Sequence, residues 1–143
     1  MSTKKVGAAG IIVNEQGHIL LVKHSYGKYN WEIPGGLSEP FESAEQTVIR
    51  EIAEETGLIA SVEKLTGVYY EEKHDMHHFV FICQVDQSQI ASADQQEVTQ
   101  CAYFDINDLP RPISDFTIIR IQDAINSPNK PSFRTVGNRV WYE

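Results

Sequence analysis

The chain has 143 residues, of which 41% are hydrophobic and 22% charged, and these values are ordinary for one soluble globular domain spanning residues 1–143. The formal net charge of −8 excludes a general binder of nucleic-acid backbones, because such proteins carry a basic patch. No apolar run approaches the length of a membrane span, so we expect neither nucleic acid nor membrane as a partner. Cys83 and Cys101 lack metal-type spacing, which favours reduced thiols and a cytoplasmic location.

Two strands are predicted before the first helix. Residues 6–13 and 18–23 have strand composition, and the turn at 14–17 between them predicts a hairpin. A polar and aromatic loop, residues 24–30, then leads into Trp31.

A turn with two glycines precedes a helix that is unusually rich in glutamate. Gly35 and Gly36 form the turn, where the missing side chain lets the backbone approach a ligand closely. The helix is predicted over residues 42–56, with Ser43 as its N-cap and Gly57 as its C-cap.

Three carboxylates gather on one side of this predicted helix. At about 100° per residue, Glu51, Glu54 and Glu55 fall within roughly a third of its circumference. Like charges one turn apart destabilise a helix, whereas a hard cation such as Mg²⁺ or Mn²⁺ takes clustered carboxylates as ligands. For these residues taken alone, a solvated acidic face is the alternative. The opposite side carries Val48, Ile49, Ile52 and Ala53.

The second half predicts an α/β (α+β) fold. Strands are expected at 59–70, 77–85 and 98–104, and a helix is expected from Ser114 or Asp115 to residue 125. Alternating strand and helix patterns favour a mixed sheet between helices. We expect the tail, residues 127–143, either to cover the domain or to meet a second subunit in a homodimer.

A group of histidines and an aspartate lies between two of these strands. His74, Asp75, His77 and His78 resemble a zinc site, but no fourth ligand stands at a recognised spacing. We therefore expect solvated turn and strand residues.

The spacing across the glycine turn and the helix resembles the Nudix box. None of the nine defined positions departs from that motif, and the lead-in Trp-Glu-Ile-Pro-Gly-Gly at 31–36 is typical of the Nudix family. Outside the box the resemblance is limited to the order of elements. The nine positions are Gly36, Glu42, Arg50, Glu51, Ile52, Glu54, Glu55, Gly57 and Leu58.

The resemblance implies an α/β/α sandwich that hydrolyses a nucleoside diphosphate linked to another moiety, with Mg²⁺ or Mn²⁺. Glu54 and Glu55 would be the primary metal ligands, and Glu51 a ligand or the base that orients water. The carbonyl of Gly36 would be a further ligand, and Arg50 would orient Glu54. Nucleoside triphosphates, nucleotide sugars, ADP-ribose and dinucleoside polyphosphates all stay open as substrates.

Residues outside the box complete the expected site. Glu97 is a candidate for a further metal-binding carboxylate or the general base, and a surface residue at a strand edge is the alternative. Lys23 is expected to face substrate phosphate, and Tyr29 and Tyr69 to stack on a base, although packing or surface roles are as compatible with their positions. A non-catalytic Nudix-like nucleotide sensor is the alternative function, but such domains usually lack box carboxylates that are all present here.

Overall fold

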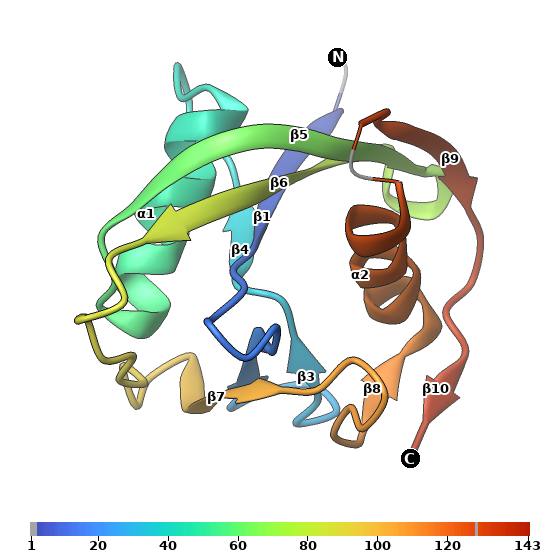
Figure 1. Ribbon diagram of the computed structural model, residues 1–143. Coiled ribbons are helices and arrows are strands. Elements are labelled where there is room, and N and C mark those ends of the chain that lie inside the picture. The colour runs from blue at the N-terminus through green and yellow to red at the C-terminus, as the bar shows by residue number, and fades with distance from the viewer. Residues whose placement is uncertain (1–2, 128) are drawn as a thin grey trace.

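Two five-stranded β-sheets and two α-helices form the computed structural model, which describes residues 3–127 and 129–143 (Figure 1). Sheet A has the strand order β4 (Gly35–Leu37), β1 (Lys5–Ile11), β6 (Met76–Val85), β5 (Ala60–Glu71) and β9 (Ser132–Val136). Sheet B has the order β10 (Trp141–Tyr142), β8 (Ile113–Ser114), β3 (Trp31–Glu32), β2 (Ile19–His24) and β7 (Val98–Phe104). The helices are α1 (Ala44–Thr56) and α2 (Asp115–Asn126), and a 3₁₀ turn spans Glu72–His74.

Sheet A is mixed and lies between the two helices, as predicted (Figure 1). Strand β1 runs parallel to β6 and antiparallel to β4. Its alternate side chains enter different cores: Ala8 packs in the cluster that contains Val48 of α1, and Ala9 in the cluster that contains Phe116 of α2. Sheet B closes the second cluster from the other side.

The predicted hairpin between the first two strands forms only around its turn, where the Leu20 N–H donates to the carbonyl of Ile12 and the Asn14 N–H to that of His18. Strands β1 and β2 belong to different sheets, and only an isolated bridge between Val13 and Ile19 links their ends. The physical reason is burial on both faces, because Ile11, Ile12 and the first four residues of β2 are at most 1% exposed. Each strand therefore needs a layer on either side, and the turn at 14–17 carries the chain from one sheet to the other.

The helix boundaries confirm the predicted caps. The hydroxyl of Ser43 accepts from the Gln46 N–H, and the Gln46 side chain accepts from the Ser43 N–H, which forms a capping box. Gly57 ends α1 at φ 73°, and the Ser114 hydroxyl caps α2.

The C-terminal tail covers the domain, one of the two expected outcomes. Strand β9 joins sheet A beside β5, and β10 joins sheet B beside β8 (Figure 1). The tail therefore spans both sheets on the side of α2. Cys83 and Cys101 are free thiols. Neither α1 nor α2, nor any other helix in the described ranges, is long and apolar enough to cross a membrane.

Candidate active site

The glycine turn and the start of the carboxylate cluster are in direct contact. A Cβ at Gly36 would lie 2.6 Å from Oε1 of Glu51, so only glycine leaves room for that carboxylate. The Gly35 N–H donates to Oε1 of Glu55 at 3.0 Å. Because β4 pairs with β1, sheet A holds the turn in place while α1 packs against it.

The three clustered glutamates of α1, Glu51, Glu54 and Glu55, do not share one environment. Glu51 and Glu55 are 8% and 4% exposed and face the turn, whereas the side chain of Glu54 is 56% exposed. The apolar side predicted from the sequence is only partly correct, because Ile49 and Ala53 are exposed. The buried side of α1 consists of Val48, Glu51, Ile52 and Glu55 with two threonines, Thr47 and Thr56.

Burial shifts the protonation of the two inward carboxylates. It raises the pKa of Glu55 to about 9, and the charge of Glu51 adds to this shift. Burial also raises the pKa of Glu51, which the guanidinium of Arg50 opposes. A pKa of about 9 means that, without a bound cation, the Glu55 carboxyl is protonated at neutral pH.

Arg50 connects the start of α1 to the carboxylate cluster. Its Nε lies 2.8 Å from Oε2 of Glu42, and its Nη1 lies 3.0 Å from Glu51 and 3.2 Å from Glu54. Its Nη2 also donates to the carbonyl of Leu37. The predicted pair with Glu54 is thus present, but the shortest contact is with Glu42, whose pKa the Arg50 hydrogen bond lowers to about 2.

Glu97 lies beside the box. Together with Glu54, Asp94 and Gln96 it lines a cavity of about 290 Å³, and its charge helps to raise the pKa of Glu51 and of Glu55. Asp94 was not predicted to lie at this site, because it stands in a polar stretch of the sequence without periodicity. Its carboxylate caps the backbone N–H groups of Gln96 and Val98, which fixes the loop that carries Glu97.

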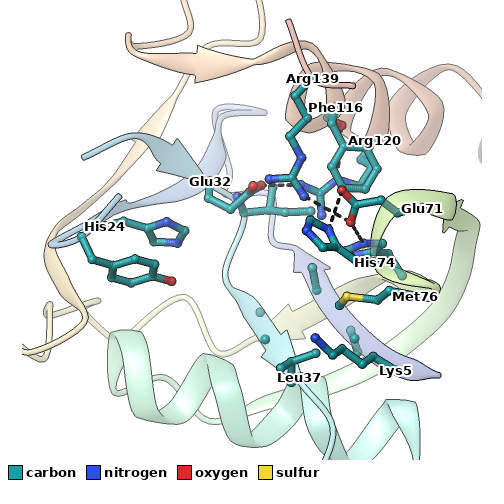
Figure 2. A pocket seen from close by; sticks show the side chains of 18 residues that line it. Lys5, His24, Glu32, Leu37, Glu71, His74, Met76, Phe116, Arg120 and Arg139 are labelled. Atoms are coloured by element: carbon teal, nitrogen blue, oxygen red, sulfur yellow. Dashed lines mark hydrogen bonds and ion pairs between the residues drawn. The ribbon is translucent and has the colours of Figure 1, made fainter. Parts of the chain in front are cut away.

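A larger pocket of about 500 Å³ begins at the glycine turn (Figure 2). Gly35 and Gly36 form one part of its wall, and α2 and the tail form another through Phe116, Arg120 and Arg139. Tyr26 also lines this pocket, and its ring stacks on His24 with centroids 4.7 Å apart.

The predicted substrate residues do not reach this pocket. Neither Lys23 nor Tyr29 lines it, and Tyr29 is 60% exposed to solvent. The assignment of Tyr69 is wrong, because its side chain is fully buried and its hydroxyl donates to Asp123 at 2.7 Å. An aromatic residue at this position of β5 has no free face for a base.

Charged residues that pair over a long range form the inner wall of the pocket, and they were not predicted from the sequence. Glu32 of β3 accepts from Arg120 and from the hydroxyl of Thr117, both on α2. The Arg120 side chain is only 4% exposed, and its guanidinium lies 3.9 Å from the Phe116 ring centroid. The pairing joins residues 88 positions apart, so no local pattern reveals it.

The histidines between residues 74 and 78 are not all exposed to solvent, contrary to expectation. His78 is held 3.0 Å from Oε1 of Glu71 with its side chain 13% exposed, and the half-exposed His74 lies 3.1 Å from Oε2. Glu71 itself is 5% exposed. These three residues belong to the pocket wall, whereas Asp75 pairs outward with Lys4 and Tyr70.

Curated relatives identify the sequence family. A family model described as the NUDIX domain matches residues 3–121. A MutT-like protein of Streptomyces ambofaciens is 31% identical over 121 residues, covering 85% of this chain and 77% of the relative. A putative 8-oxo-dGTP diphosphatase of Bacillus subtilis is 36% identical over 118 residues, covering 77% of this chain and 78% of the relative. An ADP-ribose pyrophosphatase of Methanocaldococcus jannaschii is 35% identical, covering 70% of this chain but only 62% of the relative.

Solved structures show the same fold. A Nudix hydrolase of Nitrosomonas europaea superimposes with a TM-score of 0.79 at 17% identity, over 96% of this chain and 81% of the other. An ADP-ribose pyrophosphatase of Streptococcus suis gives a TM-score of 0.72 at 22% identity, over 94% and 100%. The intact box, the family match and the shared fold agree, and the chain belongs to the Nudix hydrolase family.

Proposed function

We propose that this protein hydrolyses the phosphoanhydride bond of a nucleoside diphosphate linked to another moiety, with the help of Mg²⁺ or Mn²⁺. The observation that carries the proposal is the pair of buried carboxylates, Glu51 and Glu55, held against the backbone of the glycine turn at the mouth of a 500 Å³ pocket. Burying two adjacent carboxylates is costly unless protons or a cation compensate them. The site therefore has room for a nucleotide beside groups that attract a cation.

The donor chemistry fits a hard divalent ion. Within residues 3–127 and 129–143, no three histidine, cysteine or acidic side chains form a group that could hold a metal ion by themselves. Mg²⁺ commonly uses one or two carboxylates and completes its shell with water and substrate phosphate. We assign Glu54 and Glu55 as the main ligands, with Glu51 and the carbonyl of Gly36 as further ligands. A divalent ion bound there supplies positive charge that offsets the charge developing on the phosphate oxygens.

The chain's own residues supply the proton acceptor and the orientation. Water oxygen attacks phosphorus, the phosphorus–oxygen bond of the anhydride breaks, and the proton of the water passes to a carboxylate. Glu51 and Glu97 are the two candidates for that carboxylate. Arg50 holds Glu51 and Glu54 in fixed positions through its hydrogen bonds.

The substrate is best found with a panel. The names of the relatives point to oxidised nucleoside triphosphates and ADP-ribose as first choices. We expect hydrolysis of at least one member among normal and oxidised nucleoside triphosphates, ADP-ribose, nucleotide sugars and dinucleoside polyphosphates, giving two phosphorus-containing products. Turnover should need added Mg²⁺ or Mn²⁺ and stop with chelator. Tight binding of one member without any hydrolysis would instead support the nucleotide sensor, and turnover under full chelation would rule out the metal assignment.

A further inference from the structure

Arg139 brings a guanidinium into the pocket from outside the matched part of the chain. It lies between β9 and β10, beyond the matched range 3–121. The guanidinium lies 4.9 Å from the centroid of the Phe116 ring, and Figure 2 shows it at the pocket wall beside Glu71. Its side chain is 30% exposed and lines the pocket, which leaves it accessible to a ligand there.

No hydrogen bond joins the guanidinium of Arg139 to another residue that the structure describes. Among the described residues its guanidinium makes one contact with an acid, at 3.7 Å between Nη2 and Oε1 of Glu71, and this distance is too long for a hydrogen bond. The other arginine of the wall, Arg120, is by contrast bonded to Glu32. Glu71 accepts from His74 and His78, and a carboxylate has capacity for further donors. Unused donors and available acceptors therefore face the pocket side by side.

This arrangement suits a neutral group that presents an acceptor next to a donor. The edges of nucleobases have this character, and arginine and glutamate are among the side chains that read them. At this wall the carboxylates of Glu71 and Glu32 are balanced by two guanidiniums, those of Arg120 and Arg139. A phosphate would therefore find no net positive charge there, whereas a neutral group can use both the donors and the acceptors. Figure 2 also shows Leu37, the residue after Gly36, at the opposite end of the pocket from Arg139, so a diphosphate at the glycine turn leaves this end for the base.

We propose that Arg139 and Glu71 read the edge of the substrate's nucleobase and so determine specificity. The inference rests on the proposed function for the location of the diphosphate, but base reading can be measured without turnover. It assigns a substrate-contacting role to the C-terminal tail.

The decisive variant is Arg139→Met, which keeps an apolar stem over Phe116 and removes every N–H donor. Its kinetics are compared with wild type on nucleoside triphosphates of the four common bases and on ribose 5-triphosphate, which has no base. We expect KM for the preferred nucleotide to rise about tenfold, which corresponds to about 1.4 kcal/mol, with kcat changed less than about twofold, since an edge contact contributes to discrimination between bases. The preference among bases should shrink by a similar factor, and the base-free substrate should be unaffected.

Two further variants separate the explanations. Arg111→Met removes an exposed arginine that lies outside this pocket and should behave as wild type. Arg139→Lys keeps the charge without the planar fork, so it should not restore base preference. Full restoration by lysine would indicate a phosphate contact and overturn the proposal, as would unchanged base preference in Arg139→Met. Thermal unfolding of each variant confirms that it is folded.

Binding of non-hydrolysable nucleotide analogues makes the two proposals separable. If wild type hydrolyses no substrate but discriminates among bases in binding, and Arg139→Met abolishes this, base reading stands and the hydrolytic proposal fails. If wild type cleaves ribose 5-triphosphate as efficiently as every nucleotide, base reading fails and hydrolysis stands. Absence of both binding and cleavage overturns both.

Discussion

The carboxylate of Glu51 lies so close to Gly36 that a methyl group at position 36 would come within 2.6 Å of Oε1. The obstructing atoms are the end of a flexible side chain, so an added methyl displaces the carboxylate more easily than the backbone. Chemistry and fold should therefore respond differently to a substitution at this position.

Gly36→Ala should reduce kcat/KM by about a hundredfold, because small displacements of catalytic groups cost that much. The free energy of unfolding should fall by no more than about 1–3 kcal/mol, the usual cost of overpacking. Steady-state kinetics and urea unfolding measure the two effects. Gly137→Ala, which has open space around the new methyl group, is the stability control. Normal activity in Gly36→Ala would contradict the placement of Glu51.

Glu54→Gln should lower kcat by about two orders of magnitude or more, since loss of a metal ligand removes several kcal/mol of charge stabilisation. The fold should be unaffected because the side chain is 56% exposed. The matched control is Glu45→Gln, an exposed glutamate in the first turn of the same helix. Near-normal turnover in Glu54→Gln, measured at saturating Mg²⁺, would show that this carboxylate is not a ligand.

The pair Arg50–Glu42 should make stability depend on acid pH. The pKa of Glu42 is lowered from 4.5 to about 2, so its stabilising contribution is complete above pH 4.5 and disappears as the pH falls through about 2. Urea unfolding across this interval should show the decline in wild type and a shallower decline in both Arg50→Met and Glu42→Gln. Equal slopes in wild type and the two variants would mean that the pair does not act on stability.

In chelator-treated protein, Glu55 should make the free energy of unfolding fall as the pH rises, which is opposite to the effect of Glu42. Its pKa is raised from 4.5 to about 9, so the folded state is favoured fully below pH 4.5 and loses this advantage as the pH rises toward about 9. Glu55→Gln should flatten this part of the stability profile. Calorimetry of Mg²⁺ binding near neutral pH, in buffers of different ionisation enthalpy, should also detect proton release in wild type only. Binding without proton release would show that Glu55 is already ionised.

Tyr69→Phe tests the correction to the substrate residues. Removing the hydroxyl deletes its hydrogen bond to Asp123, and about 1 kcal/mol of stability should be lost. KM and kcat for the best substrate of the panel should not change. A large rise in KM with unchanged stability would restore Tyr69 to the substrate site.

The local parts of the fold and site were predictable because their causes are local. The capping box at Ser43, the end of α1 at Gly57 and the strand 98–104 depend on residues within a few positions. The box spacing placed Glu51, Glu54 and Glu55 near one another on α1 for a similar reason, since a helix brings residues three and four positions apart together. It did not show that Glu51 and Glu55 are buried and Glu54 exposed.

Contacts between residues far apart in the chain could not be predicted from the sequence. The pairing of Glu32 with Arg120 and the separation of β1 and β2 into different sheets both depend on tertiary packing. Of the two tyrosines in the loop at residues 24–30, the conformation of the loop decides which one lines the pocket. Tyr26 does so and stacks on His24, whereas Tyr29 has a φ of 53° and is exposed to solvent.

The split into two sheets has a consequence for how this pocket can diversify. Glu32 ends a strand of sheet B, and Gly35 begins a strand of sheet A, so the chain changes sheets between two residues that both line the pocket. No described strand of one sheet forms a ladder with a strand of the other. The width of the pocket is therefore set by side chains packed between the sheets, and their substitution can reshape the room for a substrate while the carboxylates on α1 keep their places.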